Sequence, residues 1–494
     1  MSQISQFSST GISGLDTLLR GGLIPGNTYL AQGKSGTGKS VLGQEFLHAG
    51  LDNGESVVYI HGEESREDIL ANADRIGINL RDADFLDIGA GSDFFAEDIS
   101  YELLETSDID SERFTEDIKQ LIEETDPDRV LLDPVTQLRY VERDEHVYRK
   151  RLQSFIRFLR ERETTAIVTR TYGQGEQNDS SGSDIESLSD GIIHLERAGN
   201  ERRISVLKHR GIGQMTGKHG LEIRDDGMVV FPRLIPQQYN RVFDPSLLST
   251  GNDDLDALLG GGIERGTVTM ISGQTGIGKS SLGAQILSGV LDNGGTAFGY
   301  LFEESVDQFT YRSEKLGIFS ADQKEHDNLW LREVEPMTVS AEEFGGQVLD
   351  NADEHEPDAV FIDGLGGYKS VMQGDDQRLI NRIHALTRVL KNRGSTIFLT
   401  DELDDLRQVS SATSTRTSYL ADNILLLTFL EHDRELLRAI GVLKKRLGSF
   451  ASRFHRLEIM HQNGITITDD LPAGTDVLQR SSATGASSEV QTDS

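Results

Sequence analysis

The feature that most constrains this chain is an internal repeat with one constant spacing. Segments of the first half recur 240 residues later: Ser9-Thr10-Gly11 returns as Ser249-Thr250-Gly251, and Glu63-Glu64-Ser65 returns as Glu303-Glu304-Ser305. Chance does not preserve one register over several separate features. The period is longer than the roughly 20–50 residues of solenoid repeats. The sequence therefore predicts a duplicated domain.

The repeat divides the chain of 494 residues into two domains and a tail. We place the first domain at residues 1–235 and the second at residues 246–469. The stretch 232–245 holds three of the nine prolines, which is typical of an extended linker. Residues 470–494 are rich in Ser, Thr, Gly and Ala and contain few large apolar side chains. This composition predicts a disordered tail.

Short apolar stretches alternate with amphipathic stretches along each half. In the first half, we expect a buried strand at Val130–Leu132, a helix at Val147–Arg160 and another strand at Ala166–Thr169. The second half repeats this order, with a strand at Ala359–Ile362 and a helix at Arg378–Asn392. Such alternation predicts an α/β fold in which each domain has a mostly parallel sheet flanked by helices. Stretches of alternating residues near the end of each half predict additional antiparallel strands.

A glycine-rich loop stands between a predicted strand and a predicted helix in each half, and both loops match G-x-x-x-x-G-K-[ST]. Glycines let the backbone wrap a phosphate with its N–H groups pointing inward, and the helix N-terminus adds partial positive charge. Lys39 and Lys279 are expected to reach the β- and γ-phosphates of ATP. The predicted ATP-binding residues are Gly33, Lys34, Ser35, Gly36, Thr37, Gly38, Lys39 and Ser40, and Gly273, Gln274, Thr275, Gly276, Ile277, Gly278, Lys279 and Ser280.

An aspartate ends an apolar strand downstream of each loop. Asp133 ends the run R-V-L-L-D, and Asp363 ends the run A-V-F-I-D. A carboxylate at this edge of a parallel sheet suits Mg²⁺ and its water ligands, and the loop hydroxyls of Ser40 and Ser280 suit the same ion. The alternative is an aspartate that merely begins a turn, and the upstream loops favour the metal role. The predicted cofactors are therefore ATP and Mg²⁺.

Two adjacent glutamates follow the strand after each loop helix, Glu63-Glu64 in the first half and Glu303-Glu304 in the second. A carboxylate beside a nucleotide can orient water or accept a proton, so these four residues are the candidate catalytic groups. The alternative is that they cap the next helix, because acids are favourable at a helix N-terminus. The sequence does not show which glutamate of each pair acts.

A basic pair ends a predicted strand late in each half: Lys208 and Arg210 in the first, Lys444 and Arg446 in the second. Alternation along a strand places Lys208 and Arg210 on one face. Such a pair could reach the γ-phosphate of a neighbouring subunit. The alternative is a solvated basic edge that discourages strand pairing, and the residues alone favour it.

The charge of the chain limits its partners. It has 81 acidic and 49 basic residues and a net charge of −32, which argues against nucleic acid as a partner. There is no cysteine, so disulfides and cysteine-based zinc sites are excluded. We find neither a signal-peptide pattern nor a run of about 18 apolar residues, so we expect a cytoplasmic protein without membrane association. The acid excess is similar to that of proteins from halophilic microbes.

The loops, the glutamate pairs, the strand-end aspartates and the basic pairs together resemble the KaiC family, tandem RecA-like ATPases of bacteria and archaea. The resemblance covers roughly residues 5–460. It implies two tandem RecA-like P-loop NTPase domains, assembled in a homo-hexameric ring of two tiers with ATP held between subunits. It further implies that the basic pairs act in trans and that one glutamate of each pair is catalytic. Ser418 matches a family phosphoacceptor, and Thr417 lies beside it.

The predicted function is that of a ring-shaped signalling or timing ATPase, with Ser/Thr autophosphorylation in the second domain and signalling proteins as unnamed partners. One alternative is a recombinase or helicase relative that acts on DNA, which would require basic DNA-binding loops. Another is a scaffold in which one ring only binds ATP. DNA-stimulated hydrolysis would identify the first alternative, and single loop variants would identify the second.

Overall fold

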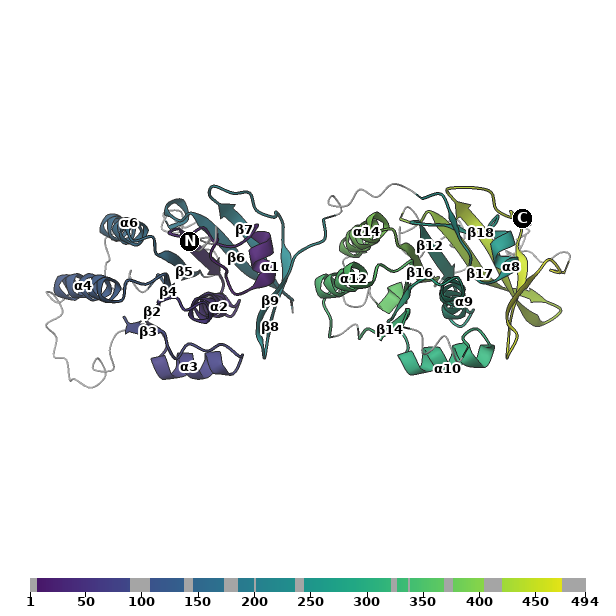
Figure 1. The fold of residues 1–494 in the computed structure, drawn as a ribbon, viewed down its shortest axis with the longest axis horizontal. Coiled ribbons are helices and arrows are strands. Elements are labelled where there is room, and N and C mark those ends of the chain that lie inside the picture. The colour runs from purple at the N-terminus through teal and green to yellow at the C-terminus, as the bar shows by residue number, and fades with distance from the viewer. Residues whose placement is uncertain are drawn as a thin grey trace, which may run out of the picture. The chain divides into compact units, whose positions relative to one another are not determined.

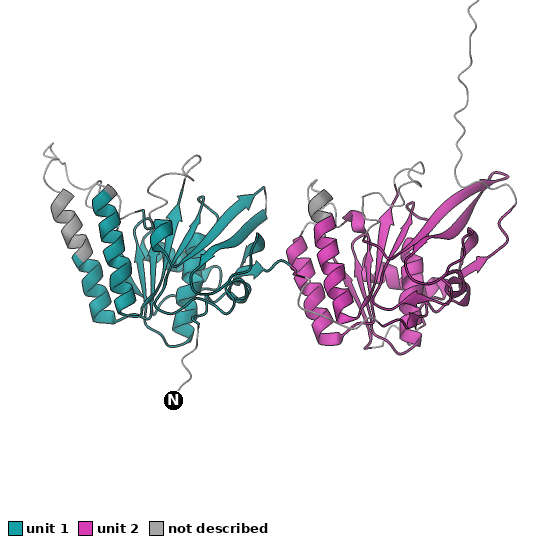
Figure 2. Ribbon diagram, turned by 90° about the horizontal axis from the view of Figure 1, so that it is seen from above, with its two compact units in different colours: residues 1–233 teal, residues 234–494 magenta. Residues whose placement is uncertain are grey.

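The computed structural model (Figure 1) describes residues 7–88, 107–136, 145–172, 185–199, 201–235, 244–320, 327–335, 338–367, 376–403 and 420–472. The chain divides into two compact units, residues 1–233 and residues 234–494 (Figure 2). Each unit is an α/β domain with a large, mostly parallel sheet, which confirms the predicted fold class. Within these ranges, none of the helices combines the length and the apolar character that crossing a membrane requires.

The first unit is built on a nine-stranded sheet with the order β3-β2-β4-β5-β1-β6-β7-β8-β9. The strands from β3 to β6 in this order are parallel, and β7, β8 and β9 continue the sheet as antiparallel neighbours. The bounds are β1 Thr28–Gly33, β2 Val57–His61, β3 Asp84–Asp87, β4 Arg129–Asp133, β5 Thr165–Thr171, β6 Gly191–Ala198, β7 Glu201–His209, β8 His219–Arg224 and β9 Gly227–Phe231.

Helices cover both faces of this sheet, because its central strands are apolar on both sides. One face packs against α1 Ser13–Leu18, α2 Lys39–Asp52 and α3 Arg66–Asp74, through residues such as Leu42 and Phe46. The other face packs against α4 Ser107–Thr125 and α6 Glu145–Glu161, through residues such as Ile122 and Leu152. The two cores fix the sheet between two helical layers.

The second unit repeats this plan, with the strand order β14-β13-β15-β16-β12-β17-β18-β19-β20. Its strands are β12 Val268–Gly273, β13 Ala297–Leu301, β14 Leu329–Glu333, β15 Ala359–Asp363, β16 Thr396–Glu402, β17 Asn423–His432, β18 Glu435–Lys445, β19 His455–Met460 and β20 Gly464–Thr468. Its helices are α8 Asp253–Leu258, α9 Lys279–Asp292 and α10 Val306–Leu316 on one face, and α12 Ala341–His355 and α14 Asp376–Arg393 on the other. A short antiparallel pair, β10 Leu247–Leu248 and β11 Ile263–Glu264, precedes β12.

Strand register brings the carboxyl ends of the central strands to one edge of each sheet. In the first unit, Gly33 of β1 pairs with Thr171 of β5, and His61 of β2 pairs with Asp133 of β4. In the second unit, Leu301 of β13 pairs with Asp363 of β15. The glycine-rich loop, the strand-end aspartate and the glutamate pair therefore meet at the same edge of each domain.

Candidate active sites

Each glycine-rich loop links the central strand of its sheet to a buried helix. Gly36 and Gly38 have φ values of +73° and +103°, in the left-handed region that glycine adopts without strain. The corresponding Gly276 and Gly278 have φ values of +73° and +116°. The last glycine of each loop precedes the first residue of α2 or α9. The two loops thus share the conformation that aims a helix N-terminus at the loop.

The loop lysines point into their own loops. The Lys39 ammonium donates to the carbonyl oxygen of Lys34 at 2.9 Å. The Lys279 ammonium donates to the carbonyl oxygens of Gly273 and Gln274, both at 3.0 Å. Burial lowers the pKa of Lys39, and the nearby carboxylates of Asp133 and Glu63 partly offset this. Each lysine is therefore held where it can contact a phosphate that the loop encloses.

Each strand-end aspartate is held by a threonine from the neighbouring strand. Thr169 of β5 donates its hydroxyl to Oδ1 of Asp133, whose Oδ2 accepts from the Tyr59 hydroxyl at 3.1 Å. In the second domain, Thr400 of β16 donates to Oδ1 of Asp363 at 2.7 Å. Neither threonine belongs to a recognisable sequence motif, although the two stand at equivalent places in the two repeats.

Asp363 fits a role in magnesium binding. Its carboxylate is buried, and its Oδ2 has no hydrogen-bond partner among the described residues. A buried carboxylate oxygen without a partner is costly unless a cation or its water shell satisfies it. No cluster of three or more His, Cys, Asp or Glu within the described ranges could hold a metal ion by itself. In nucleotide sites, Mg²⁺ is typically held by one or two protein groups, water and phosphate.

The first glutamate of each pair interacts electrostatically with the loop lysine and the strand-end aspartate. Glu63 interacts electrostatically with Asp133 and Lys39, and Glu303 interacts with Asp363 and Lys279. Partial burial raises the pKa of both glutamates, and the neighbouring aspartate raises it further. In the second domain, Glu402 at the end of β16 adds to this effect. The pair residue nearest the strand is thus part of each site.

The second glutamate of each pair is bound to its own helix. The Glu304 carboxylate accepts two hydrogen bonds from Arg312 of α10, at 2.5 and 2.7 Å. The Glu64 carboxylate accepts from the Asn72 amide of α3 at 3.2 Å. Neither glutamate caps the helix, because the next residue does. The hydroxyls of Ser65 and Ser305 accept from the backbone N–H groups three residues later.

The basic pairs occupy the same place in both sheets, although their spacing is not 240 residues. Lys208 of β7 pairs with Ile192 of β6, and Lys444 of β18 pairs with Ile424 of β17. The Lys208 ammonium donates to the carbonyl oxygens of Glu186, Ser187 and Ser189, and the Lys444 ammonium donates to that of Ala421. Burial lowers the pKa of both lysines.

The arginines of these pairs are more exposed. The side chains of Arg210 and Arg446 are 56% and 59% exposed. Each donates one hydrogen bond, at 3.0 Å, to the aspartate directly before the neighbouring strand, Asp190 or Asp422. Asp190, which binds Arg210, also bonds Thr28, the first residue of β1. Arg210 therefore lies at the end of the sheet where β1 begins, whereas the phosphate loop follows the last residue of β1. The five steps from Thr28 to Gly33 span roughly 16 Å.

A family model described as ATPase: KaiC matches residues 8–235 and again residues 248–471. The chain belongs to the KaiC family of ATPases.

Individual KaiC relatives are similar over nearly the whole chain. The Circadian clock oscillator protein KaiC of Acaryochloris marina is 28% identical over 469 residues, which cover 92% of this chain and 87% of that protein. The protein of the same name from Parathermosynechococcus lividus is 28% identical over 477 residues, covering 93% and 85%. Circadian clock oscillator protein KaiC 1 of Synechocystis sp. is 27% identical over 475 residues, covering 93% and 88%.

Ser418, which matches a family phosphoacceptor, and the adjacent candidate Thr417 lie outside the described ranges. The remaining candidate residues all lie within the described ranges. In each domain, the glycine-rich loop, the strand-end aspartate and the glutamate pair meet at the carboxyl ends of the parallel strands, whereas the basic pair lies at their opposite ends. The residues that sequence analysis missed are Thr169 and Thr400, Arg312, and the aspartates Asp190 and Asp422. The signal for the aspartates was available, because L-S-D-G-I and L-A-D-N-I begin equivalent strands of this KaiC-family chain.

Proposed function

We propose that both domains bind Mg²⁺ and ATP and hydrolyse ATP, with Glu63 and Glu303 as the catalytic bases. The observation that carries this proposal is the division of labour within each glutamate pair. The first glutamate interacts electrostatically with both the loop lysine and the strand-end aspartate. The second is hydrogen-bonded to its own helix, although Glu304 also interacts with Asp363. The same division in two domains supports a shared chemical role.

The residues suggest how hydrolysis proceeds. Lys39 or Lys279 neutralises charge on the β- and γ-phosphates, and Glu63 or Glu303 in its ionised form accepts a proton from the attacking water. Ser40 and Asp133, or their counterparts Ser280 and Asp363, would hold Mg²⁺, which would supply positive charge against the phosphates.

We further propose that each site is completed by a neighbouring copy in a hexameric ring. Arg210 and Arg446 lie where the central parallel strand of their own domain begins. The phosphate loop of the same domain lies where that strand ends, one strand length away. Their exposed guanidinium groups suit the γ-phosphate of another subunit. Lys208 and Lys444, which are bound to carbonyl oxygens, would support this edge.

We also propose that the second domain phosphorylates the protein itself, between neighbouring chains of the ring. The hydroxyl of Ser418 or Thr417 of a neighbouring chain would attack the γ-phosphorus while Glu303 takes the hydroxyl proton and ADP leaves. The relatives named as circadian clock oscillator proteins support a signalling or timing role for these activities.

Paired glutamate variants test the proposal. In a Glu63→Gln background, all remaining phosphate release comes from the second domain, and there we compare Glu303→Gln with Glu304→Gln. Loss of a general base is expected to lower kcat about 10²- to 10⁴-fold for Glu303→Gln. Glu304→Gln, which chiefly alters the contact with Arg312, should retain kcat within a few fold. The reverse order of the two variants would contradict the assignment.

A further inference from the structure

One buried aspartate in each domain joins three separate parts of the fold. The carboxylate of Asp190 is 4% exposed and accepts hydrogen bonds from the Thr28 backbone N–H at 3.2 Å, from Arg160 at 2.6 Å and from Arg210 at 3.0 Å. Thr28 begins β1, which leads to the phosphate loop, and Arg160 stands in the last turn of α6. Asp190 thus connects the central strand, a flanking helix and the basic pair.

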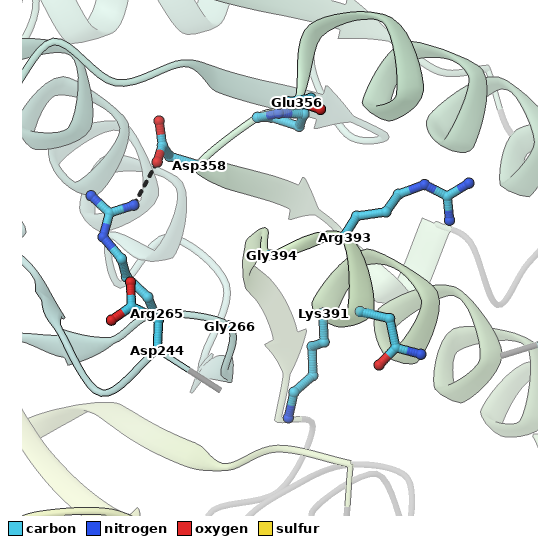
Figure 3. Close-up of a pocket in the computed structure, with 10 residues that line it drawn as sticks. Asp244, Arg265, Gly266, Glu356, Asp358, Lys391, Arg393 and Gly394 are labelled. Atoms are coloured by element: carbon cyan, nitrogen blue, oxygen red, sulfur yellow. Dashed lines mark hydrogen bonds and ion pairs between the residues drawn. The ribbon is translucent and has the colours of Figure 1, made fainter. Parts of the chain in front are cut away.

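The second domain repeats the arrangement with a different cation. Asp422 is 6% exposed and accepts from the Val268 backbone N–H at 3.0 Å, from Lys391 at 2.6 Å and from Arg446 at 3.0 Å. Lys391 stands near the end of α14, beside the pocket shown in Figure 3, where Arg265 and Asp358 form an ion pair of their own. The geometry is kept although the helix cation changes from arginine to lysine.

The arginine contact is double, which fixes its direction. The Arg210 backbone N–H donates to the carbonyl oxygen of Asp190 at 2.9 Å, while its guanidinium donates to the Asp190 carboxylate. Arg446 makes the same two contacts with Asp422, the backbone one at 3.0 Å. A long side chain held at both ends loses little further freedom when it binds a phosphate. One guanidinium nitrogen is occupied by the carboxylate, and the exposed remainder of the fork is available for a ligand.

We propose that Asp190 and Asp422 are positioning residues, each of which orients the arginine of its domain toward the γ-phosphate bound by the neighbouring subunit. This inference rests on the proposed trans action of Arg210 and Arg446. If the aspartate had a purely structural role, loss of either of its two cations should lower kcat equally. If it positions the arginine, only loss of the arginine contact should lower kcat.

The first test compares variants that touch the same carboxylate. All chains carry Glu303→Gln, so phosphate release reports the first domain. Asp190→Asn keeps an oxygen that can accept from the Thr28 N–H but removes the charge that holds Arg210. We expect kcat to fall roughly 10- to 100-fold, with KM for ATP changed less than about twofold. Arg160→Gln removes the other cation and is expected to leave kcat within about twofold. Equal losses of kcat in both variants would overturn the proposal.

The second test uses mixed rings, because an arginine that acts in trans can be supplied by another chain. Asp190→Asn chains, which retain Glu63, are mixed in equal amounts with Glu63→Gln chains, which retain Asp190 and Arg210. Random assembly gives intact sites at about one quarter of the positions. Turnover should return to about one quarter of that of the parent ring. A domain damaged by Asp190→Asn would not recover in this way.

A reference mixture distinguishes failure of the positioning role of Asp190 from failure of the trans action of Arg210. Arg210→Ala chains mixed with Glu63→Gln chains should also regain about one quarter of the turnover. If this reference mixture recovers and the Asp190→Asn mixture does not, the positioning role is wrong and the proposed function stands. If the reference mixture fails, trans action by Arg210 is wrong and both proposals fall. The matched pair in the second domain is Asp422→Asn with Lys391→Gln, measured in a Glu63→Gln background.

Discussion

Replacing the threonine that holds the strand-end aspartate should destabilise the two domains by different amounts. Thr400 is buried, donates to Asp363 and also accepts from the Gly364 backbone N–H at 2.6 Å. Thr400→Val keeps the shape but removes both bonds. Among the described residues, the Asp363 carboxylate then has no hydrogen-bond donor, and the Gly364 N–H loses its acceptor. The first domain offers the matched change, Thr169→Val.

In the first domain, Thr169→Val leaves fewer polar groups without a hydrogen-bond partner. Asp133 keeps the hydrogen bond from Tyr59, and the next residue, Pro134, has no N–H to lose. The orphaned N–H of Gly364 should therefore make Thr400→Val costlier by about 1–3 kcal/mol. For a domain of this size, each 1 kcal/mol lowers Tm by roughly 2–4 °C.

Hydrogen exchange, read separately for the core strands of each domain, measures both losses in one protein. The expected result is a larger loss of protection in the second domain of Thr400→Val than in the first domain of Thr169→Val. The Mg²⁺ concentration for half-maximal turnover should also rise in Thr400→Val, because Asp363 loses its orientation. Equal losses of protection would refute the reasoning from the Gly364 N–H and the unpartnered Asp363 oxygen.

Four further predictions concern the same sites. Burial raises the pKa of Glu63 and Glu303, and only the ionised base is active. As the pH decreases, kcat should therefore begin to fall at a pH above the ordinary glutamate pKa of about 4.3. The pH profile of kcat, measured in chains that keep only one of the two glutamates, checks this. The same raised pKa stabilises the fold only while the carboxyl is protonated, so Glu303→Gln should raise Tm more at pH 8 than at pH 4. Removing Mg²⁺ with a chelator should stop turnover reversibly, and Asp363→Asn should shift the Mg²⁺ requirement upward by at least about tenfold. Labelled phosphate from γ-labelled ATP should appear on Ser418 or Thr417 by peptide mapping and vanish in Glu303→Gln; hydrolysis without any label would leave a plain ATPase.

Sequence patterns located most of the parallel core, and register explains what they missed. The predicted strands Val130–Leu132 and Ala359–Ile362 lie within β4 and β15, because continuous apolar runs are typical of strands buried on both faces. The edge strands β3 and β14 were not predicted, since their apolar runs are only two and three residues long and none of their residues is fully buried. Edge position comes from the fold and leaves little trace in composition.

The candidate sites show the same limit. The phosphate loops are contiguous in sequence, so a local pattern is sufficient to find them. Thr400 reaches Asp363 only because β16 pairs beside β15, and Asp422 reaches Arg446 only because β17 and β18 form an antiparallel pair. These residues are separated from their partners along the chain, and their repeats do not keep the 240-residue spacing. The choice within each glutamate pair likewise required the contact between Arg312 and Glu304.

The most direct test of the account measures assembly and turnover in the same sample. Because Arg210 and Arg446 lie a strand length from their own phosphate loops, a lone chain should have incomplete sites. Light scattering during gel filtration in high salt, with ATP and Mg²⁺ present, should report the mass of six chains, and phosphate release should coincide with that peak. A single chain that hydrolyses ATP at the full rate would contradict the claim that neighbouring subunits complete the sites.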